Sequence, residues 1–192
     1  MIRFLFIIGF SFQTLGLSAQ KTLLKENLDK LDSALLKSTN PSYFFFGYFF
    51  NDTENAIIIN TFSGNNQQDN FFRLQFFEIK NNQWEKKNEY DRLQILWPIL
   101  TRFTNYNQDA IPDFLIKAGY IGTGGNDIEY LFLFEPKNNS LQLIKGFENL
   151  ATTFYNRKTK IITSMDTSAG IPNYIYYQIK NYVPIESGGN FF

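Results

Sequence analysis

The chain has 192 residues and contains no histidine and no cysteine, and its 18 basic residues balance 18 acidic ones. Without histidine or cysteine it cannot form a Ser-His-Asp triad, a Cys-His dyad or an HExxH zinc site. The balanced charge provides no basic excess for nucleic acid or for an anionic lipid surface, so we expect neither as a partner.

The first 19 residues are typical of a secretory signal peptide. Arg3 supplies the positive start, Phe4 to Leu17 is largely apolar, and Ala19 is a small residue at the cleavage position. The apolar run is shorter than the roughly 20 residues of a membrane-spanning helix, so no membrane span is expected. The alternative is a buried N-terminal helix. Export without any cysteine favours a bacterial periplasm or cell surface, and it excludes a lipid anchor on an N-terminal cysteine.

Residues 20–192 are then expected to form a single β-rich domain that opens with one helix. Between residues 21 and 38, leucines recur at helical spacing with charged residues between them, which predicts an amphipathic helix that ends at Thr39-Asn40-Pro41. The apolar stripe comprises Leu24, Leu28, Leu31 and Leu35. Such a stripe is more often part of a core than of a coiled coil, which would need more heptads.

From residue 42 to residue 185 the sequence changes to short segments rich in aromatic and β-branched residues, separated by polar turns. This pattern predicts antiparallel sheets in a propeller-like or sandwich arrangement. The expected strands are 42–50, 56–62, 71–80, 83–87, 113–118, 128–134, 140–145, 160–164, 174–180 and 183–185. Residues 92–103 are ambiguous, because Pro98 excludes an uninterrupted helix or central strand. The aromatic runs 43–50 and 71–77 are expected to lie in the core rather than to stack on a ligand.

The polar stretch 105-NYNQDAIPD-113 has the spacing of a calcium-binding loop. Oxygens at positions 1, 3, 5, 7 and 9 converge on a hard cation when such a loop curls. The candidate ligands are the side chains of Asn105, Asn107, Asp109 and Asp113 and the carbonyl of Ile111. Ala110 stands where such loops usually have glycine, and it would be strained if that position needs a positive φ. The alternative is an Asx-rich turn whose side chains cap their own backbone.

Two loops of small residues, 119–126 and 166–174, connect predicted strands. The first, GYIGTGGN, lacks the lysine of a phosphate-binding loop. Loops of this composition on a β scaffold commonly form binding surfaces.

Carboxylates are the remaining candidates for catalysis. The pairs Asp127/Glu129 and Glu85/Glu89 could be proposed as glycosidase groups, but such an enzyme needs two carboxylates facing each other across a cleft. The sequence shows no such cleft, and we therefore predict a binding protein and not an enzyme.

Residues 103–180 contain four pieces that, in their order and spacing, resemble a family of small exported bacterial proteins related to the periplasmic lysozyme inhibitors. The pieces are 105-NYNQDAIPDFLI-116, 119-GYIGTGGN-126, 130-YLFLFEPKNNSLQLI-144 and 157-RKTKIITSMDTSAGIPNYIYY-177. The first is similar to the family's D-x-N-x-D-G-x-x-D calcium signature. Asn107, Asp109 and Asp113 match that signature, whereas Asn105 and Ala110 depart from it. This piece also looks like a single FG-GAP-type calcium blade.

The resemblance implies an antiparallel β fold and a non-enzymatic protein, an inhibitor or immunity-type protein, whose loops enter the cleft of a muramidase. Ca²⁺ is the one cofactor expected. The partner contacts expected from the two loops are Gly122, Gly124, Asn126, Ser168, Gly170 and Tyr174. The alternative is an envelope or surface protein-interaction module that uses an FG-GAP-like calcium blade and has no enzyme target.

Overall fold

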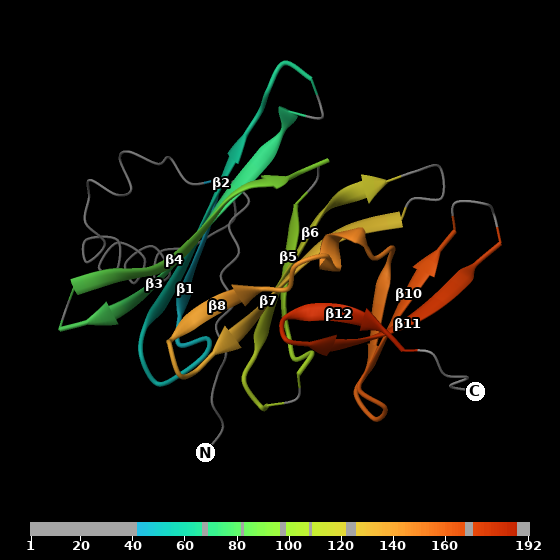
Figure 1. Cartoon of the computed structure of the whole chain (residues 1–192). Helices are drawn as coiled ribbons and strands as arrows, with labels where there is room; N and C mark the ends of the chain where they lie inside the picture. Colours follow the sequence, from blue (N-terminus) through green and yellow to red (C-terminus); the bar gives the residue numbers. More distant parts are fainter. Residues whose placement is uncertain are drawn as a thin grey trace, which may run out of the picture. The chain divides into compact units, whose positions relative to one another are not determined.

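The computed structural model describes residues 42–66, 69–81, 83–96, 99–107, 109–121, 126–167 and 171–187. The described residues form twelve strands and one short 3₁₀ helix (Figure 1). The strands build three four-stranded antiparallel sheets, which confirms the prediction of a mainly β chain. The predicted signal peptide (1–19) and amphipathic helix (21–38) lie outside the described residues. No helix within the described ranges is long and apolar enough to cross a bilayer.

The first sheet is a meander of four strands in chain order. Its strands are β1 (Tyr43–Gly47), β2 (Asn55–Phe62), β3 (Phe71–Lys80) and β4 (Gln83–Gln94). The aromatic runs contribute to its core, as expected, and Phe50 packs edge-on against the fully buried Phe76 with ring centroids 5.6 Å apart. β4 continues to Gln94, although the sequence predicts its end at Lys87. Most of its side chains are at least partly exposed, so it lacks the apolar alternation by which a strand is identified.

The contacts divide the chain into two compact units, Met1–Leu93 and Gln94–Phe192, where the sequence predicts one domain. The second unit holds two further meanders, ordered β5-β6-β7-β8 and β12-β11-β10-β9. Their strands are β5 (Leu100–Thr104), β6 (Asp113–Ile121), β7 (Asn126–Glu135), β8 (Ser140–Leu143), β9 (Thr153–Asn156), β10 (Ile161–Asp166), β11 (Asn173–Lys180) and β12 (Val183–Glu186). The 3₁₀ helix η2 (Phe147–Asn149) follows β8 in the chain. A four-stranded meander is also the strand pattern of a propeller blade.

One hydrophobic core connects the two sheets of the second unit. Leu115 of β6 and Leu131 of β7 belong to the same buried cluster as Ile162 of β10. Phe147 of η2 is fully buried in this cluster, and the ring of Tyr106 meets it edge-on at a centroid distance of 5.7 Å. Burial of each such side chain contributes roughly 1.5–3 kcal/mol. This packing holds the strand ends from which the loops of the second unit start.

At Gly119 the pairing between β6 and β7 is irregular, and the backbone of Leu96 packs closely against this position. The register shifts between Lys117 and Gly119, where the φ of Gly119 is 131°. The backbone N–H of Leu96 donates to the carbonyl of Ala118 at 2.7 Å, and a Cβ on Gly119 would lie 2.7 Å from the carbonyl carbon of Leu96. Both the dihedral angle and the lack of space therefore require glycine here.

Candidate functional site

The candidate calcium loop connects β5 to β6 and ends at Asp113, the first residue of β6. Ala110, at position 6 of the loop, has a φ of 68°. In this left-handed region a Cβ costs roughly 1–2 kcal/mol. The sequence predicts strain at Ala110 if this position needs a positive φ, and the φ is indeed positive. The backbone makes the turn for which calcium loops usually keep a glycine, although alanine occupies the position here.

The carboxyl group of Asp113 is fully buried and only partly satisfied. Its Oδ2 accepts a hydrogen bond from the backbone N–H of Tyr106 at 2.6 Å, while Oδ1 is buried without a hydrogen-bond partner. Burial raises the pKa of Asp113 to about 7; the Tyr106 hydrogen bond opposes this rise, and the negative charge of Asp109 adds to it. The N–H groups of Phe134 and Asn107 lower the pKa by smaller amounts. The ionised form of this carboxylate is thus poorly stabilised by the protein alone.

Within the loop, Asn107 and Asp109 make the hydrogen bonds of an Asx turn. Asp109 Oδ1 accepts from the backbone N–H of Ile111 at 2.9 Å, and Asp109 Oδ2 accepts from Asn107 Nδ2 at 2.8 Å. Asn107 Oδ1 in turn accepts from the backbone N–H of Asp109 at 3.3 Å. These bonds agree with the alternative of a polar turn. They do not explain why Asp113 Oδ1 is buried without a partner.

The donor set of the loop fits Ca²⁺ better than a metal that prefers nitrogen or sulfur. Among the described residues there is no group of three or more acidic, histidine or cysteine side chains that could hold a metal. A cation here would depend on the carboxylates of Asp109 and Asp113, two asparagine side chains and the carbonyl of Ile111. Calcium accepts such mixed oxygen ligands and irregular geometry. An unpartnered buried carboxylate oxygen close to a second carboxylate is an arrangement that a cation would neutralise.

Asn126, the first residue of β7, joins the bases of the two loops predicted to contact a partner. Its Nδ2 donates to Asp166 Oδ1 at 2.8 Å, at the end of β10. Its Oδ1 accepts from the backbone N–H of Thr167 at 3.2 Å and from the Thr167 hydroxyl at 3.0 Å. The loops 119–126 and 166–174 therefore have neighbouring bases. Asn126 is buried, so its side chain serves this connection inside the unit.

Of the predicted contact residues, Asn126 and Tyr174 fall within the described residues. Gly122, Gly124, Ser168 and Gly170 lie outside them. Tyr174 is 49% exposed near the start of β11, as a partner contact requires.

Two further exposed apolar side chains, which the sequence analysis did not select, lie near the same loop bases. Tyr120 is 47% exposed and Ile171 is 77% exposed. Tyr120 is next in the chain to Ile121, which pairs with Asn126 between β6 and β7. Tyr174 is next to Asn173, which pairs with Asp166 between β10 and β11. We call Tyr120, Ile171 and Tyr174 the loop-end surface. Their aromatic and β-branched character does not distinguish them from core residues in the sequence, so only their exposure identifies them.

Glu129, which the sequence offers as half of a glycosidase pair, belongs to a buried polar network of the second unit whose bonds were not predicted. Glu129 of β7 accepts hydrogen bonds from the hydroxyl of Thr153 and from Arg102 Nη2, the latter at 3.4 Å. The hydroxyl of Thr153 lies 3.2 Å from that of Tyr106. Burial raises the pKa of Glu129, and the hydrogen bond from Thr153 and the charge of Arg102 oppose that rise. The signal in the sequence is a single acidic residue inside the otherwise apolar strand 128–134.

The carboxylate pairs considered for glycosidase chemistry are engaged in ion pairs within the fold. These are Asp127–Lys117 at 2.7 Å, Glu89–Lys86 at 2.7 Å and Glu85–Lys87 at 3.4 Å, while Glu129 contacts Arg102 at 3.4 Å.

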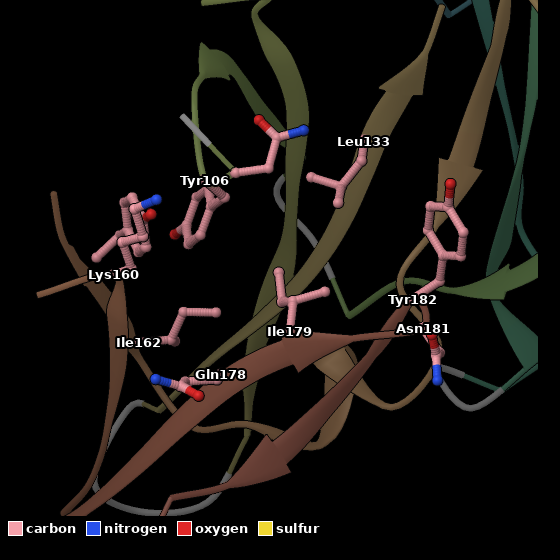
Figure 2. Close-up of a pocket in the computed structure, with 10 residues that line it drawn as sticks. Tyr106, Leu133, Lys160, Ile162, Gln178, Ile179, Asn181 and Tyr182 are labelled. Carbon is pink, nitrogen blue, oxygen red and sulfur yellow. The ribbon is translucent and has the colours of Figure 1, made fainter. Parts of the chain in front are cut away.

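A pocket of 560 Å³ opens beside the calcium loop. It is lined by residues of the β5–β6 loop, of strands β7, β9, β10 and β11, and of the turns that join β9 to β10 and β11 to β12. Figure 2 shows Tyr106 and Lys160 on one side of the pocket and Tyr182 on the other, with Leu133 and Ile179 between them. Nothing in the spacing of these residues along the chain predicts that they meet.

No protein-family model, no curated protein and no solved structure gives a significant match to this chain. The relationship to the lysozyme inhibitors is therefore a hypothesis that rests on the four sequence pieces alone.

Proposed function

We propose that this chain is an exported, non-enzymatic binding protein that inhibits a muramidase through its loop-end surface. The observation that carries the proposal is the hydrogen bonding of Asn126, which holds the bases of two small-residue loops next to each other. Loops of this kind, carried on a packed β scaffold, are a common way to build a contact surface. The muramidase as the partner comes from the sequence resemblance.

The chemistry of the loop-end surface supports protein binding. Tyr120 and Tyr174 present large rings with a polar hydroxyl, and Ile171 is an exposed aliphatic side chain. Tyrosine is enriched at protein interfaces, and a few such anchors supply most of the binding free energy. In the proposed complex these residues border the loops that enter the enzyme cleft and exclude its substrate.

Calcium has a structural role in this proposal. The side chains of Asn105, Asn107, Asp109 and Asp113 and the carbonyl of Ile111 would hold it. When bound, the ion supplies positive charge to Asp109 and Asp113 and stabilises the β5–β6 connection. Within the second unit, the two meanders would be arranged like propeller blades or as a sandwich, with the calcium loop at one strand end.

Inhibition of several types of lysozyme by the purified protein tests the proposal directly. We expect inhibition of at least one type, and we expect the double substitution Ile171→Asp/Tyr174→Asp to raise the inhibition constant at least tenfold. A tenfold change corresponds to about 1.4 kcal/mol, within the range for loss of an interface anchor. The matched control is Ile185→Asp, because Ile185 is also exposed, at 44%, but lies in β12 away from the loop bases. Equal inhibition by the double variant and the native protein would show that the loop-end surface is not the contact.

The second candidate function is an envelope or surface interaction module with no enzyme target. The left-handed turn at Ala110 and the unpartnered Asp113 oxygen favour this second function, because they support a calcium-binding blade and such a blade requires no enzyme target. It predicts no inhibition of any muramidase, together with calcium-dependent capture of an envelope protein.

A further inference from the structure

We propose that the pocket beside the calcium loop binds a sugar that carries a carboxylate. The pocket lies at the opposite strand ends from the loop-end surface. Ile162 of β10 lines the pocket, and Asp166 of the same strand bonds to Asn126 four residues further on. At about 3.3 Å per residue, the two sites are separated by roughly 13 Å. The inference therefore goes beyond the proposed inhibition of a muramidase and does not depend on it.

Three residues of the pocket lining, Lys160, Asn181 and Tyr182, have backbone that non-glycine residues rarely adopt, with φ of 51° at Asn181. Lys160 has a φ of 60° and Tyr182 a φ of 59°. Asn181 and Tyr182 form the turn between β11 and β12, where a sequence such as Asn-Gly would be free of this strain. The Tyr182 hydroxyl bonds to Glu135, which helps to hold its turn. Lys160 ends the turn between β9 and β10, and its backbone N–H donates to the carbonyl of Asn156 at 2.8 Å. Backbone outliers of this type cluster at ligand sites.

The lining has the mixed character that a pyranose ring needs. Leu133, Ile162 and Ile179 give an apolar floor for the C–H face of the ring. Tyr155 and Tyr106 lie against each other with centroids 5.0 Å apart and add an aromatic wall. The volume of 560 Å³ lies within the range of small-molecule sites, about 300–1,000 Å³.

The polar groups around this floor can both donate and accept hydrogen bonds. Gln178, Asn181 and Asn107 line the pocket and carry side-chain amides, of which the Asn107 amide is already bonded to Asp109. Each amide has a donor end and an acceptor end, as do the hydroxyl groups of a sugar. The amides of Gln178 and Asn181 therefore suit a ligand rich in hydroxyl or acetamido groups, whereas the hydroxyls of Tyr106 and Tyr182 already contact Thr153 and Glu135.

Lys160 determines the charge of the ligand. Among the described residues that line the pocket it is the one that carries a charge, and its ammonium group forms no ion pair with any of them or with the other described residues. No acidic side chain among the described residues lines the pocket. A carboxylate on the sugar would pair with this ammonium and form a charge-assisted hydrogen bond.

Titration of the purified protein with three small ligands, followed by NMR, tests the inference. The ligands are N-acetylmuramic acid, N-acetylglucosamine, which lacks the lactyl carboxylate, and D-lactate, which lacks the sugar. We expect N-acetylmuramic acid to bind at least fivefold more tightly than either of the others. Lys160→Met should reduce its affinity to that of N-acetylglucosamine. Lys158→Met is the matched control, because it removes a positive charge from the same turn outside the pocket lining and should leave affinity unchanged.

Each other outcome overturns the inference. Failure of all three ligands to bind would show that the pocket is not a sugar site. Equal binding of lactate and N-acetylmuramic acid would leave a simple anion site, and equal effects of the two lysine substitutions would leave only diffuse charge attraction. Both lysines are exposed, so the variants should fold, and unchanged melting temperatures would verify this. Inhibition of lysozyme by the same samples is read separately, so failure of one proposal leaves the other standing.

Discussion

Substitution of Asp113 by asparagine should stabilise the protein in the absence of calcium. The pKa of Asp113 is raised from 3.8 to about 7 in the folded state, chiefly by burial. The folded protein therefore holds this proton more tightly than the unfolded chain does. The stabilisation from the protonated group is fully present below about pH 4 and is lost as the pH rises through 7. Above pH 7 the buried carboxylate costs roughly 4 kcal/mol, at about 1.4 kcal/mol per pKa unit.

The substitution Asp113→Asn removes this charge but keeps an oxygen that can accept the N–H of Tyr106. Its NH₂ group then replaces an oxygen that has no hydrogen-bond partner, at a cost of about 1–3 kcal/mol for an unsatisfied buried donor. The net gain at pH 8 is therefore about 1–3 kcal/mol. In a chain of this size, 1 kcal/mol raises the melting temperature by about 2–4 °C.

Thermal unfolding between pH 5 and pH 8, in chelator and in millimolar calcium, measures both effects. In chelator the difference in melting temperature between Asp113→Asn and the native protein should grow with pH. Glu129, whose pKa is also raised by burial, is present in both proteins, so its contribution cancels in this difference. Calcium should raise the native melting temperature most at pH 8, where Asp113 is ionised, and should not affect the variant. Magnesium is the control ion. An advantage that is the same at every pH would refute the raised pKa, and no response to calcium would identify the loop as an Asx turn.

Three further predictions concern single backbone and hydrogen-bond positions. Ala110→Gly should increase the free energy of unfolding by up to about 1 kcal/mol, measured with urea, because the left-handed φ of 68° no longer strains a Cβ; an unchanged value would mean that the turn is relaxed. Gly119→Ala should destabilise by about 2 kcal/mol or more, because its Cβ would lie 2.7 Å from Leu96. Gly146→Ala is its control for the φ strain alone, because the nearest atom to that Cβ is 3.9 Å away, and equal losses would exclude the steric contribution. Asn126→Ala should lower the free energy of unfolding by about 1–3 kcal/mol, because it removes the hydrogen bonds between β7 and the end of β10. It should also weaken muramidase inhibition. Lower stability with unchanged inhibition would show that the loop bases do not contribute to the contact with the muramidase.

The sheets could be predicted because their residues alternate or cluster by type. The apolar segments that become β2, β3 and β7 are surrounded by turn residues, and each is a strand. The end of β4 could not be predicted, since its side chains are largely polar and its pairing depends on a neighbouring strand. A strand of this kind is specified by backbone hydrogen bonds to β3, which the sequence does not display.

The candidate sites also differ in whether their residues are close together in the sequence and could therefore be predicted from it. The calcium loop lies within nine consecutive residues, so its donors are visible in the sequence together with the unusual alanine at position 6. Asn126 could be placed in a loop from its position, but its bonds to Asp166 and Thr167 join residues about 40 positions apart. The strain at Lys160 and Tyr182 is likewise a consequence of hairpin geometry, which composition alone does not reveal.

Tyr106 connects the calcium loop to the pocket, and the two sites should therefore influence each other. Its backbone N–H bonds to Asp113, its ring lines the pocket, and its hydroxyl lies 3.2 Å from that of Thr153 in the buried network. An ion that fixes Asp113 would also fix the neighbouring wall of the pocket, and by thermodynamic reciprocity a ligand in the pocket would strengthen ion binding by the same factor. The loop-end surface contains none of these residues and begins at the other ends of the strands. Calcium should therefore change the affinity for the sugar more than it changes the affinity for the muramidase.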